Sequence, residues 1–221
     1  MQEALSAFVL KLEATKPAMS DTPENPTQET RASTPSDEQL MVAFAGGSAE
    51  AFTELFARYK QPIFGFFRRR VADPARAEEL AQETFLAVVR AAGRYEARAL
   101  FRTYLYAIGF RLLRSYRRKA AFRAAFLGMA TRDREPATRN TTEVEVWLRH
   151  AIGKLERSDR EVLLLREFEE LSYAEIGELL HLPLNTVRSR LFRARTALRE
   201  SLAAPSAKTV NAKLKESEEH A

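Results

Sequence analysis

The sequence predicts an all-α protein made of two small helical domains joined by a flexible linker. Apolar residues recur at spacings of three and four through most of residues 36–119 and 142–202. No stretch sustains the strict apolar–polar alternation of a half-buried strand. Between the two periodic blocks, residues 120–141 combine Gly, Pro, Thr and Arg with a weak apolar pattern, which predicts the linker.

Both chain ends are expected to lie outside these domains. Residues 1–35 include a stretch rich in Pro, Ser, Thr and Glu without periodic apolar residues, so we expect a disordered extension. Met19 offers an alternative start of translation. Residues 203–221 are predicted to form a polar tail beyond the last helix, which we expect to stop before Pro205.

Composition narrows the possible partners. Among 221 residues, the 35 Lys and Arg exceed the 30 Asp and Glu, which favours a polyanion such as nucleic acid or an acidic membrane surface. The absence of cysteine excludes disulfides, thiolate zinc sites and a cysteine nucleophile. No apolar run reaches the ~18–20 residues that span a bilayer, and the N-terminus makes a poor signal peptide. We therefore expect a cytoplasmic protein without membrane insertion.

The second block has the pattern of a helix-turn-helix. Ser158 with Glu161 and Ser172 with Glu175 have the spacing of capping boxes, which predicts two helix starts. The helix after Ser172 is expected to be short and to end about Leu180. A turn over residues 181–183 follows, and its proline suits the first turn of another helix.

That next helix is predicted to be amphipathic. The residues expected to face the core are Val187, Leu191, Ala194, Leu198 and Leu202. Its other face is rich in arginine and carries an exposed Phe192. A short helix, a tight turn and a basic second helix form the arrangement that places a helix in the major groove, where arginine can donate two hydrogen bonds to guanine. The alternative for an isolated Arg-rich helix is a solvated face, but the turn chemistry and Phe192 favour DNA reading.

These residues resemble region 4 of extracytoplasmic-function (ECF) sigma factors of bacterial RNA polymerase. The motifs that carry the resemblance are LSYAEI at residues 171–176 and TVRSRLFRAR at residues 186–195. Gly177 and Asn185 stand where Ala and Gly are usual, and His181, where Gly is common, is expected to adopt a left-handed conformation. The resemblance implies that the upstream (−35) promoter element is contacted by Arg188, Ser189, Arg190, Phe192 and Arg193.

The first block carries two surfaces of opposite charge. An acidic stripe lies opposite the apolar face of its third helix and consists of Glu78, Glu79, Gln82 and Glu83. Taken alone, this stripe reads as a solvated face. The stretch of residues 98–119 has basic residues and no acidic one, with aromatic residues interleaved. Such a combination suits single-stranded DNA, although most of these rings are expected to be core because they lie at helical spacing.

The first block resembles region 2 of the same family. The matching motifs are AFTELFARY at residues 51–59, DPARAEELAQETFL at 73–86 and FRTYLYAI at 101–108. The resemblance implies that the acidic stripe docks on the clamp helices of the polymerase's largest subunit, and that the loop at about residues 93–100 captures an unstacked base. The residues assigned to the downstream (−10) element are Tyr95, Arg98, Arg102, Tyr104, Arg111, Arg114, Arg117 and Arg118.

The resemblance implies core RNA polymerase as a partner, through the clamp helices and the flap of the second largest subunit. Promoter DNA and an anti-sigma factor are the other expected partners, and the anti-sigma factor would hold the chain near the membrane. Arg76, Tyr104 and Arg111 depart from the family pattern, where an acid, Trp and Asn are usual.

No metal, cofactor or catalytic function is expected. The three histidines, His150, His181 and His220, lack metal-ligand spacing, and no Gly-rich phosphate loop is present. The main alternative is a stand-alone helix-turn-helix regulator that binds operators as a dimer, which would leave the acidic and basic-aromatic helices of the first block unexplained. An enzyme or nucleotide sensor fused to a DNA reader is a third possibility.

Overall fold

A computed structural model describes residues 35–97, 99–127 and 143–218. Every regular element among these residues is a helix, and they divide into two compact units, one on each side of residues 128–142. The prediction of an all-α chain with two helical domains is therefore confirmed. No helix within the described ranges has both the length and the apolar character needed to cross a membrane.

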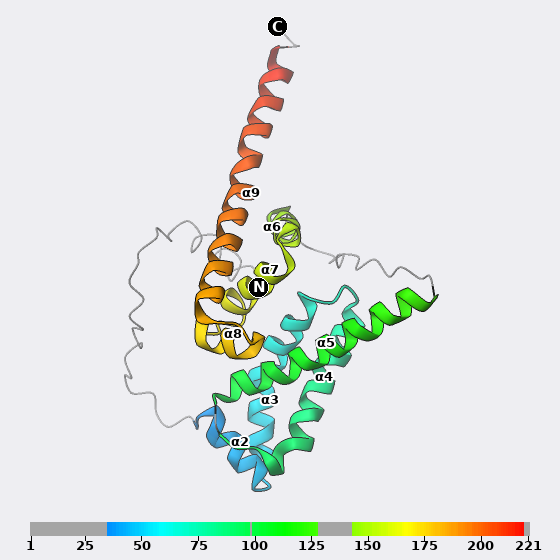
Figure 1. The fold of residues 1–221 in the computed structure, drawn as a ribbon, viewed down its shortest axis with the longest axis vertical. Coiled ribbons are helices and arrows are strands. Elements are labelled where there is room, and N and C mark those ends of the chain that lie inside the picture. Colours follow the sequence, from blue (N-terminus) through cyan, green and yellow to red (C-terminus); the bar gives the residue numbers. More distant parts are fainter. Residues whose placement is uncertain (1–34, 98, 128–142, 219–221) are drawn as a thin grey trace, which may run out of the picture. The chain divides into compact units, whose positions relative to one another are not determined.

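The first unit contains four α-helices and one short 3₁₀ helix (Figure 1). They are α2 (Asp37–Ala45), α3 (Ala49–Arg68), α4 (Pro74–Ala91), η1 (Ala92–Arg94) and α5 (Phe101–Leu127). The helix starts follow local chemistry. Ser36 and Gln39 form the expected capping box of α2, Ser48 caps α3, and Asp73 caps α4 just before its N-terminal proline.

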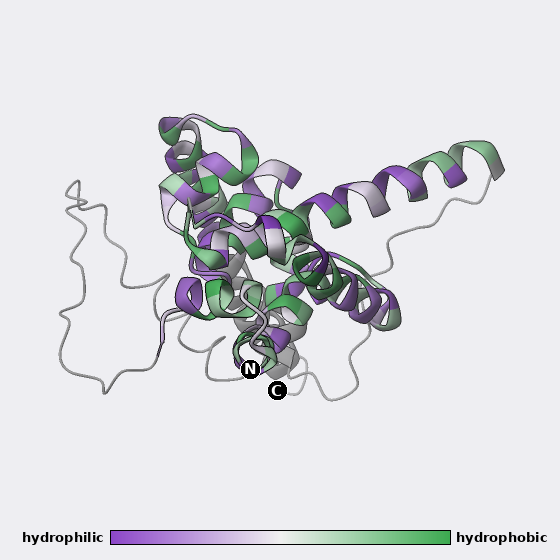
Figure 2. Ribbon diagram, turned by 90° about the horizontal axis from the view of Figure 1, so that it is seen from below, coloured by the Kyte–Doolittle hydropathy of each residue, from purple (hydrophilic) through white to green (hydrophobic). Residues whose placement is uncertain are grey.

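Aromatic and aliphatic side chains from α2 to α5 make one core in this unit. The ring of Phe66 on α3 is fully buried and contacts the rings of Phe67, Tyr106 and Phe110. Met41 on α2 is fully buried as well. Figure 2 shows apolar positions and strongly hydrophilic ones alternating along these helices, which is the periodicity that the sequence displayed.

The described residues of the second unit, 143–218, form four helices. They are α6 (Glu143–Lys154), α7 (Arg157–Glu167), α8 (Tyr173–Leu180) and α9 (Leu184–Glu218). Its core is aliphatic, and α7 and α8 both pack on α9. The fully buried side chains include Leu148, Leu163, Leu165, Ile176, Val187 and Leu198.

Three predicted boundaries are wrong. The helix α7 begins at Arg157, because Glu156 rather than Ser158 is the cap: its carboxylate accepts hydrogen bonds from the Ser158 and Asp159 N–H groups. The linker was expected from residue 120, yet α5 continues to Leu127, since alanine-rich sequence there still favours helix.

The polar tail is the third correction. The helix α9 runs on to Glu218 and passes through Pro205 (Figure 1). A proline removes one backbone donor and bends a helix, but it does not always end one. Pro62 lies inside α3 in the same way. The predicted burial of Leu202 falls on a side chain outside the described part.

Candidate nucleic-acid interface

The turn between α8 and α9 fixes the orientation of the basic helix. Ser172 and Glu175 form the predicted capping box at the start of α8. At its end, His181 takes the predicted left-handed conformation with φ 55°, and the Leu182 N–H donates to the Gly177 carbonyl oxygen at 2.8 Å. A Cβ atom on Gly177 would lie 2.9 Å from the Leu182 carbonyl oxygen. The glycine is therefore required by the close approach of the turn.

The arginine-rich face of α9, which the sequence predicted to read DNA, is exposed to solvent. Val187, Leu191, Ala194 and Leu198 are buried, and the opposite face carries the residues assigned to the upstream element. Four of these five, Arg188, Ser189, Phe192 and Arg193, are exposed, whereas Arg190 is half-buried. Phe192 is 66% exposed, so a large ring stands among arginines without a ring contact to the residues that the structure describes.

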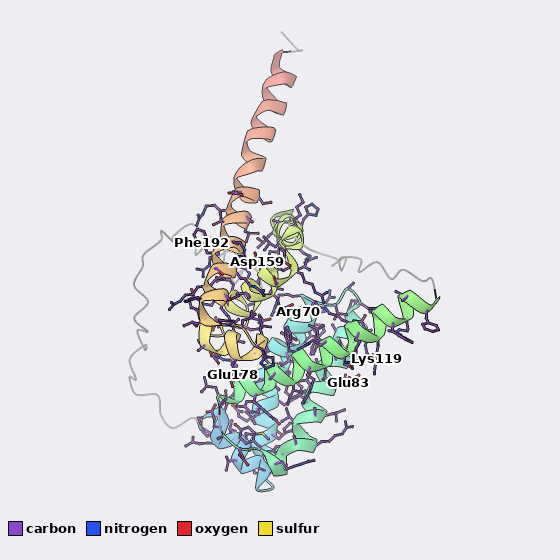
Figure 3. The ribbon with its side chains drawn as sticks, in the orientation of Figure 1. Arg70, Glu83, Lys119, Asp159, Glu178 and Phe192 are labelled. Atoms are coloured by element: carbon purple, nitrogen blue, oxygen red, sulfur yellow. The ribbon has the colours of Figure 1, made fainter. Side chains whose placement is uncertain are left out.

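Arg193 is held by a carboxylate of the same unit. Its Nε and Nη2 atoms donate to Asp159 on α7 at 2.9 and 2.8 Å, while the Asp159 side chain is only 9% exposed. Figure 3 shows Asp159 and Phe192 on the neighbouring helices α7 and α9. The hydrogen bonds that Arg193 donates to Asp159 raise the pKa of its guanidinium. Arg195 makes a comparable pair with Glu167, at 2.7 Å.

Sequence reasoning missed Asp159 and Glu167. Asp159 stands 34 residues before Arg193, and no local pattern connects the two positions. The only sequence signal for Asp159 was its place as an acidic residue in the first turn of α7. A favourable interaction with the helix dipole explains that place equally well.

The basic helix α5 presents its predicted arginines to solvent along its length. Arg111, Arg114 and Arg118 are exposed, and Arg102 and Arg117 are half-buried. Arg98 lies outside the described residues. Tyr95 and Tyr104 are half-buried, with ring centroids 5.3 Å apart, and burial raises the pKa of both hydroxyls. The structure thus places these two rings as one cluster beside the start of α5.

A hollow of about 400 Å³ lies at the same end of α5. Its lining comprises Ser36, Asp37, Glu38, Arg58, Tyr59, Leu100 and Arg102. Asp37 accepts from Arg58 at 2.6 Å and from the Tyr59 hydroxyl, whose pKa is raised chiefly by burial. Glu38 accepts from the Phe101 N–H at 2.8 Å and so caps α5 from α2. Helix α2 therefore holds the C-terminal end of the loop at residues 93–100 in place.

The acidic stripe on α4 is solvent-facing, as expected, but it is not purely acidic. Glu78, Glu79 and Gln82 are exposed and Glu83 is half-buried. Arg76 pairs with Glu79 at 2.5 Å and lies 3.6 Å from Glu83, and its guanidinium also sits 5.2 Å from the ring centroid of Tyr116. The unusual arginine thus neutralises part of the stripe and connects it to α5.

Two apolar residues extend this stripe and were missed from the sequence. Leu86 and Val89 on α4 are 50% and 42% exposed. On the same helix, Phe85 and Val88 are buried and make the contact with the core. Exposed apolar residues next to charged ones are typical of a protein-binding surface. Among the residues that the structure describes, no group of three His, Asp or Glu could hold a metal ion.

Two family models match the chain, one on each unit. Residues 55–123 match sigma-70 region 2, and residues 145–198 match sigma-70 region 4. The two matches follow the order that the motifs predicted.

Curated relatives cover most of the chain. The RNA polymerase sigma-H factor of Pseudomonas aeruginosa is 34% identical over 180 residues, which are 75% of this chain and 93% of that protein. The RNA polymerase sigma factor CarQ of Myxococcus xanthus is 34% identical over 168 residues, covering 73% and 95%. The ECF RNA polymerase sigma factor SigC of Mycobacterium tuberculosis is 32% identical over 175 residues, covering 75% and 92%.

Two solved structures are also similar to this chain. CnrH, determined in complex with the cytosolic domain of CnrY, is 29% identical, with a TM-score of 0.58 over 76% of this chain and 97% of that chain. The sigma factor RpoE of Bartonella quintana, determined with the anti-sigma factor NepR, has a TM-score of 0.62 over 71% and 99%, and at 19% identity it supports the fold alone.

Proposed function

The chain belongs to the ECF sigma factors of bacterial RNA polymerase, and from this membership we propose how its surfaces divide the work of promoter-specific initiation. The first unit, residues 36–127, would act as region 2, which binds polymerase and opens the downstream element. The second unit, from residue 143 onward, would act as region 4, which reads the upstream element. The protein as a whole would act by binding and by separating the DNA strands, without covalent catalysis.

The exposed basic face of α9 is the observation that carries the upstream assignment. Arg188, Ser189, Phe192 and Arg193 project from one side of a helix that follows a tight, well-capped turn. In a helix-turn-helix this helix enters the major groove. Arg190 is half-buried and would contribute at the edge of the interface.

The hollow beside the loop at residues 93–100 supports the downstream assignment. Its walls combine the ring of Tyr59 with Arg102 and the carboxylates of Asp37 and Glu38, so they offer a stacking face together with donors and acceptors for a base edge. A base that leaves the duplex loses stacking, at a cost of a few kcal/mol, and such contacts would offset that cost. Arg111, Arg114, Arg117 and Arg118 would track the phosphates along α5.

The stripe of Glu78, Glu79, Gln82 and Glu83, extended by Leu86 and Val89, is the surface proposed to bind the polymerase clamp helices. Apolar anchors beside charged residues fit a protein interface better than a solvated face does. Region 4 would contact the flap. The sigma factor RpoE of Bartonella quintana was solved with the anti-sigma factor NepR, so an anti-sigma factor is the proposed inhibitory partner of this chain. The protein would then work in the cytoplasm with polymerase, on the nucleoid or held near the membrane.

In vitro transcription tests this function. Core polymerase with the purified chain should initiate from a subset of genomic fragments, whereas core polymerase alone should not. Failure to associate with core polymerase, combined with tight operator binding by a dimer of the chain, would instead support the stand-alone regulator.

A further inference from the structure

The C-terminal end of α5 carries an exposed aromatic pair that none of these roles uses. Phe122 and Phe126 are 63% and 76% exposed, and their rings stack with centroids 5.0 Å apart and an interplanar angle of 27°. In Figure 1 this end of α5 projects past α4, which agrees with the exposure of the two rings.

Cations surround this pair. Arg118, Lys119 and Arg123 are exposed on the same turns of the helix, and α5 contains no acidic residue. A hollow of about 770 Å³ lies between α5 and the start of α4. Its lining comprises Asp73, Arg76, Tyr116, Arg118, Lys119, Phe122 and Arg123. Figure 3 shows Lys119 on this part of α5. The hollow therefore has four basic side chains, one acidic side chain and two aromatic rings.

We propose that this aromatic-basic end of α5 is a second binding site for single-stranded DNA. Flat rings that stack on bases, combined with cations that meet phosphates, are the chemistry of single-strand binding. Duplex DNA hides its bases and would leave both rings without a partner. The inference rests on the proposed function, since promoter opening supplies the single strand.

The site is separate from the hollow at the start of α5. Phe122 lies 21 residues after Phe101 on one helix, or about 30 Å at ~1.5 Å per residue. A single captured base at the first site cannot reach the second. The helix would therefore hold exposed strand at both of its ends, with the arginines between them on the phosphates, which would stabilise the open promoter against closing.

Anisotropy with a fluorescein-labelled oligodeoxythymidylate and the full-length chain tests the site. The double variant Phe122→Leu/Phe126→Leu keeps apolar area but loses the flat stacking faces, and it should bind the single strand at least about fivefold more weakly. Phe122→Tyr/Phe126→Tyr should bind like the parent. Val42→Ala, at an apolar site on α2 that is 57% exposed, is the control and should change nothing.

Salt dependence separates the rings from the cations. The leucine pair should leave the slope of log affinity against log salt unchanged, whereas Lys119→Gln/Arg123→Gln, at two cations not assigned to the downstream element, should lower it by about 0.7 per lost phosphate contact. A leucine pair that binds single strand normally, or one that weakens a duplex of equal length to the same extent, would overturn the inference. The inference would also be overturned if thymidine monophosphate competed with the oligonucleotide at equal nucleotide concentration, because that result would identify a free-nucleotide site.

Polymerase association is measured on the same variants. The leucine pair should associate normally, and its open complexes should be shorter-lived. If the parent chain fails to bind core polymerase, the proposed function fails whatever the oligonucleotide result. Normal polymerase binding together with unchanged single-strand affinity in the leucine pair would refute this site alone.

Discussion

Arg193 on the recognition helix and Asp159 on α7 form a two-pronged ion pair, with N–O distances of 2.9 and 2.8 Å. The carboxylate is buried, whereas the guanidinium is 58% exposed. Two hydrogen bonds fix the plane of the guanidinium, since the fork of donors matches the carboxylate. Arg193 therefore meets DNA from a position set by α7, and Asp159 limits which of its donors remain for a base.

The first prediction concerns this pair. Arg193→Ala should lower transcription from promoters that depend on the upstream element, and it should reduce discrimination at one base pair by roughly tenfold, the range of a lost two-bond base contact. Polymerase association should stay intact. Normal transcription from such a promoter would contradict the assignment of the recognition helix.

Stability measurements isolate the role of Asp159. Arg193→Ala leaves a buried carboxylate without its partner, so the thermal midpoint should fall. The double variant Asp159→Ala/Arg193→Ala should recover much of that midpoint but none of the transcription. If Asp159 orients Arg193, then Asp159→Ala alone should weaken discrimination at the same base pair as Arg193→Ala does.

The second prediction concerns the acidic stripe. Reversing Glu79 and Glu83 to Lys should weaken association with core polymerase, because interfacial charges control both encounter and docking register. The reversal also places two cations beside Arg76, so Arg76→Ala in the same background distinguishes internal repulsion from lost docking. Glu178→Lys/Glu200→Lys, at exposed positions of α8 and α9, is the charge-matched control. Circular dichroism should show an unchanged helix content, and normal polymerase binding by the double reversal would disprove the assignment.

The third prediction concerns the turn of the helix-turn-helix. Gly177→Ala should destabilise the protein by about 1–3 kcal/mol, because the added Cβ would meet the Leu182 carbonyl oxygen at 2.9 Å. His181→Gly should stabilise it by up to about 1 kcal/mol, since glycine adopts the left-handed conformation without the Cβ penalty. Denaturant unfolding measures both.

Combining the two substitutions tests whether they are coupled. A glycine at residue 181 would let the turn shift away from the new Cβ, so the double variant should be more stable than the sum of the single effects. Strict additivity would show that the turn is rigid for another reason.

The fourth prediction concerns the cap that α2 provides for α5. Glu38→Ala removes the acceptor of the Phe101 N–H and should cost about 1 kcal/mol, the usual value of a helix-capping bond. Glu38→Gln keeps an acceptor oxygen and should lose less. Because the cap ends the loop at residues 93–100, the alanine variant should also open promoters more slowly while binding polymerase normally. Equal stability of all three proteins would exclude the capping role.

The sequence by itself determined the features that depend on neighbouring residues. Spacings of three and four predicted the helices, and the Ser172–Glu175 box and the residues around His181 predicted the turn, because helix starts and ends are decided within a few residues. The motifs on α4 and α9 then indicated the family. Reliance on local composition also explains the errors at residues 120–127 and after Pro205. There the composition predicted the end of a helix, but the backbone continues as helix.

Only the tertiary structure decided which side chains meet across the sequence. Glu38 reaches Phe101 across 63 positions and Asp159 reaches Arg193 across 34, and no local pattern encodes either pair. The exposure of Val89, Phe122 and Phe126 was likewise settled by how much of each helix the neighbouring helices cover. Helical periodicity gives the direction in which a residue points, but burial depends on whether another element is there to meet it.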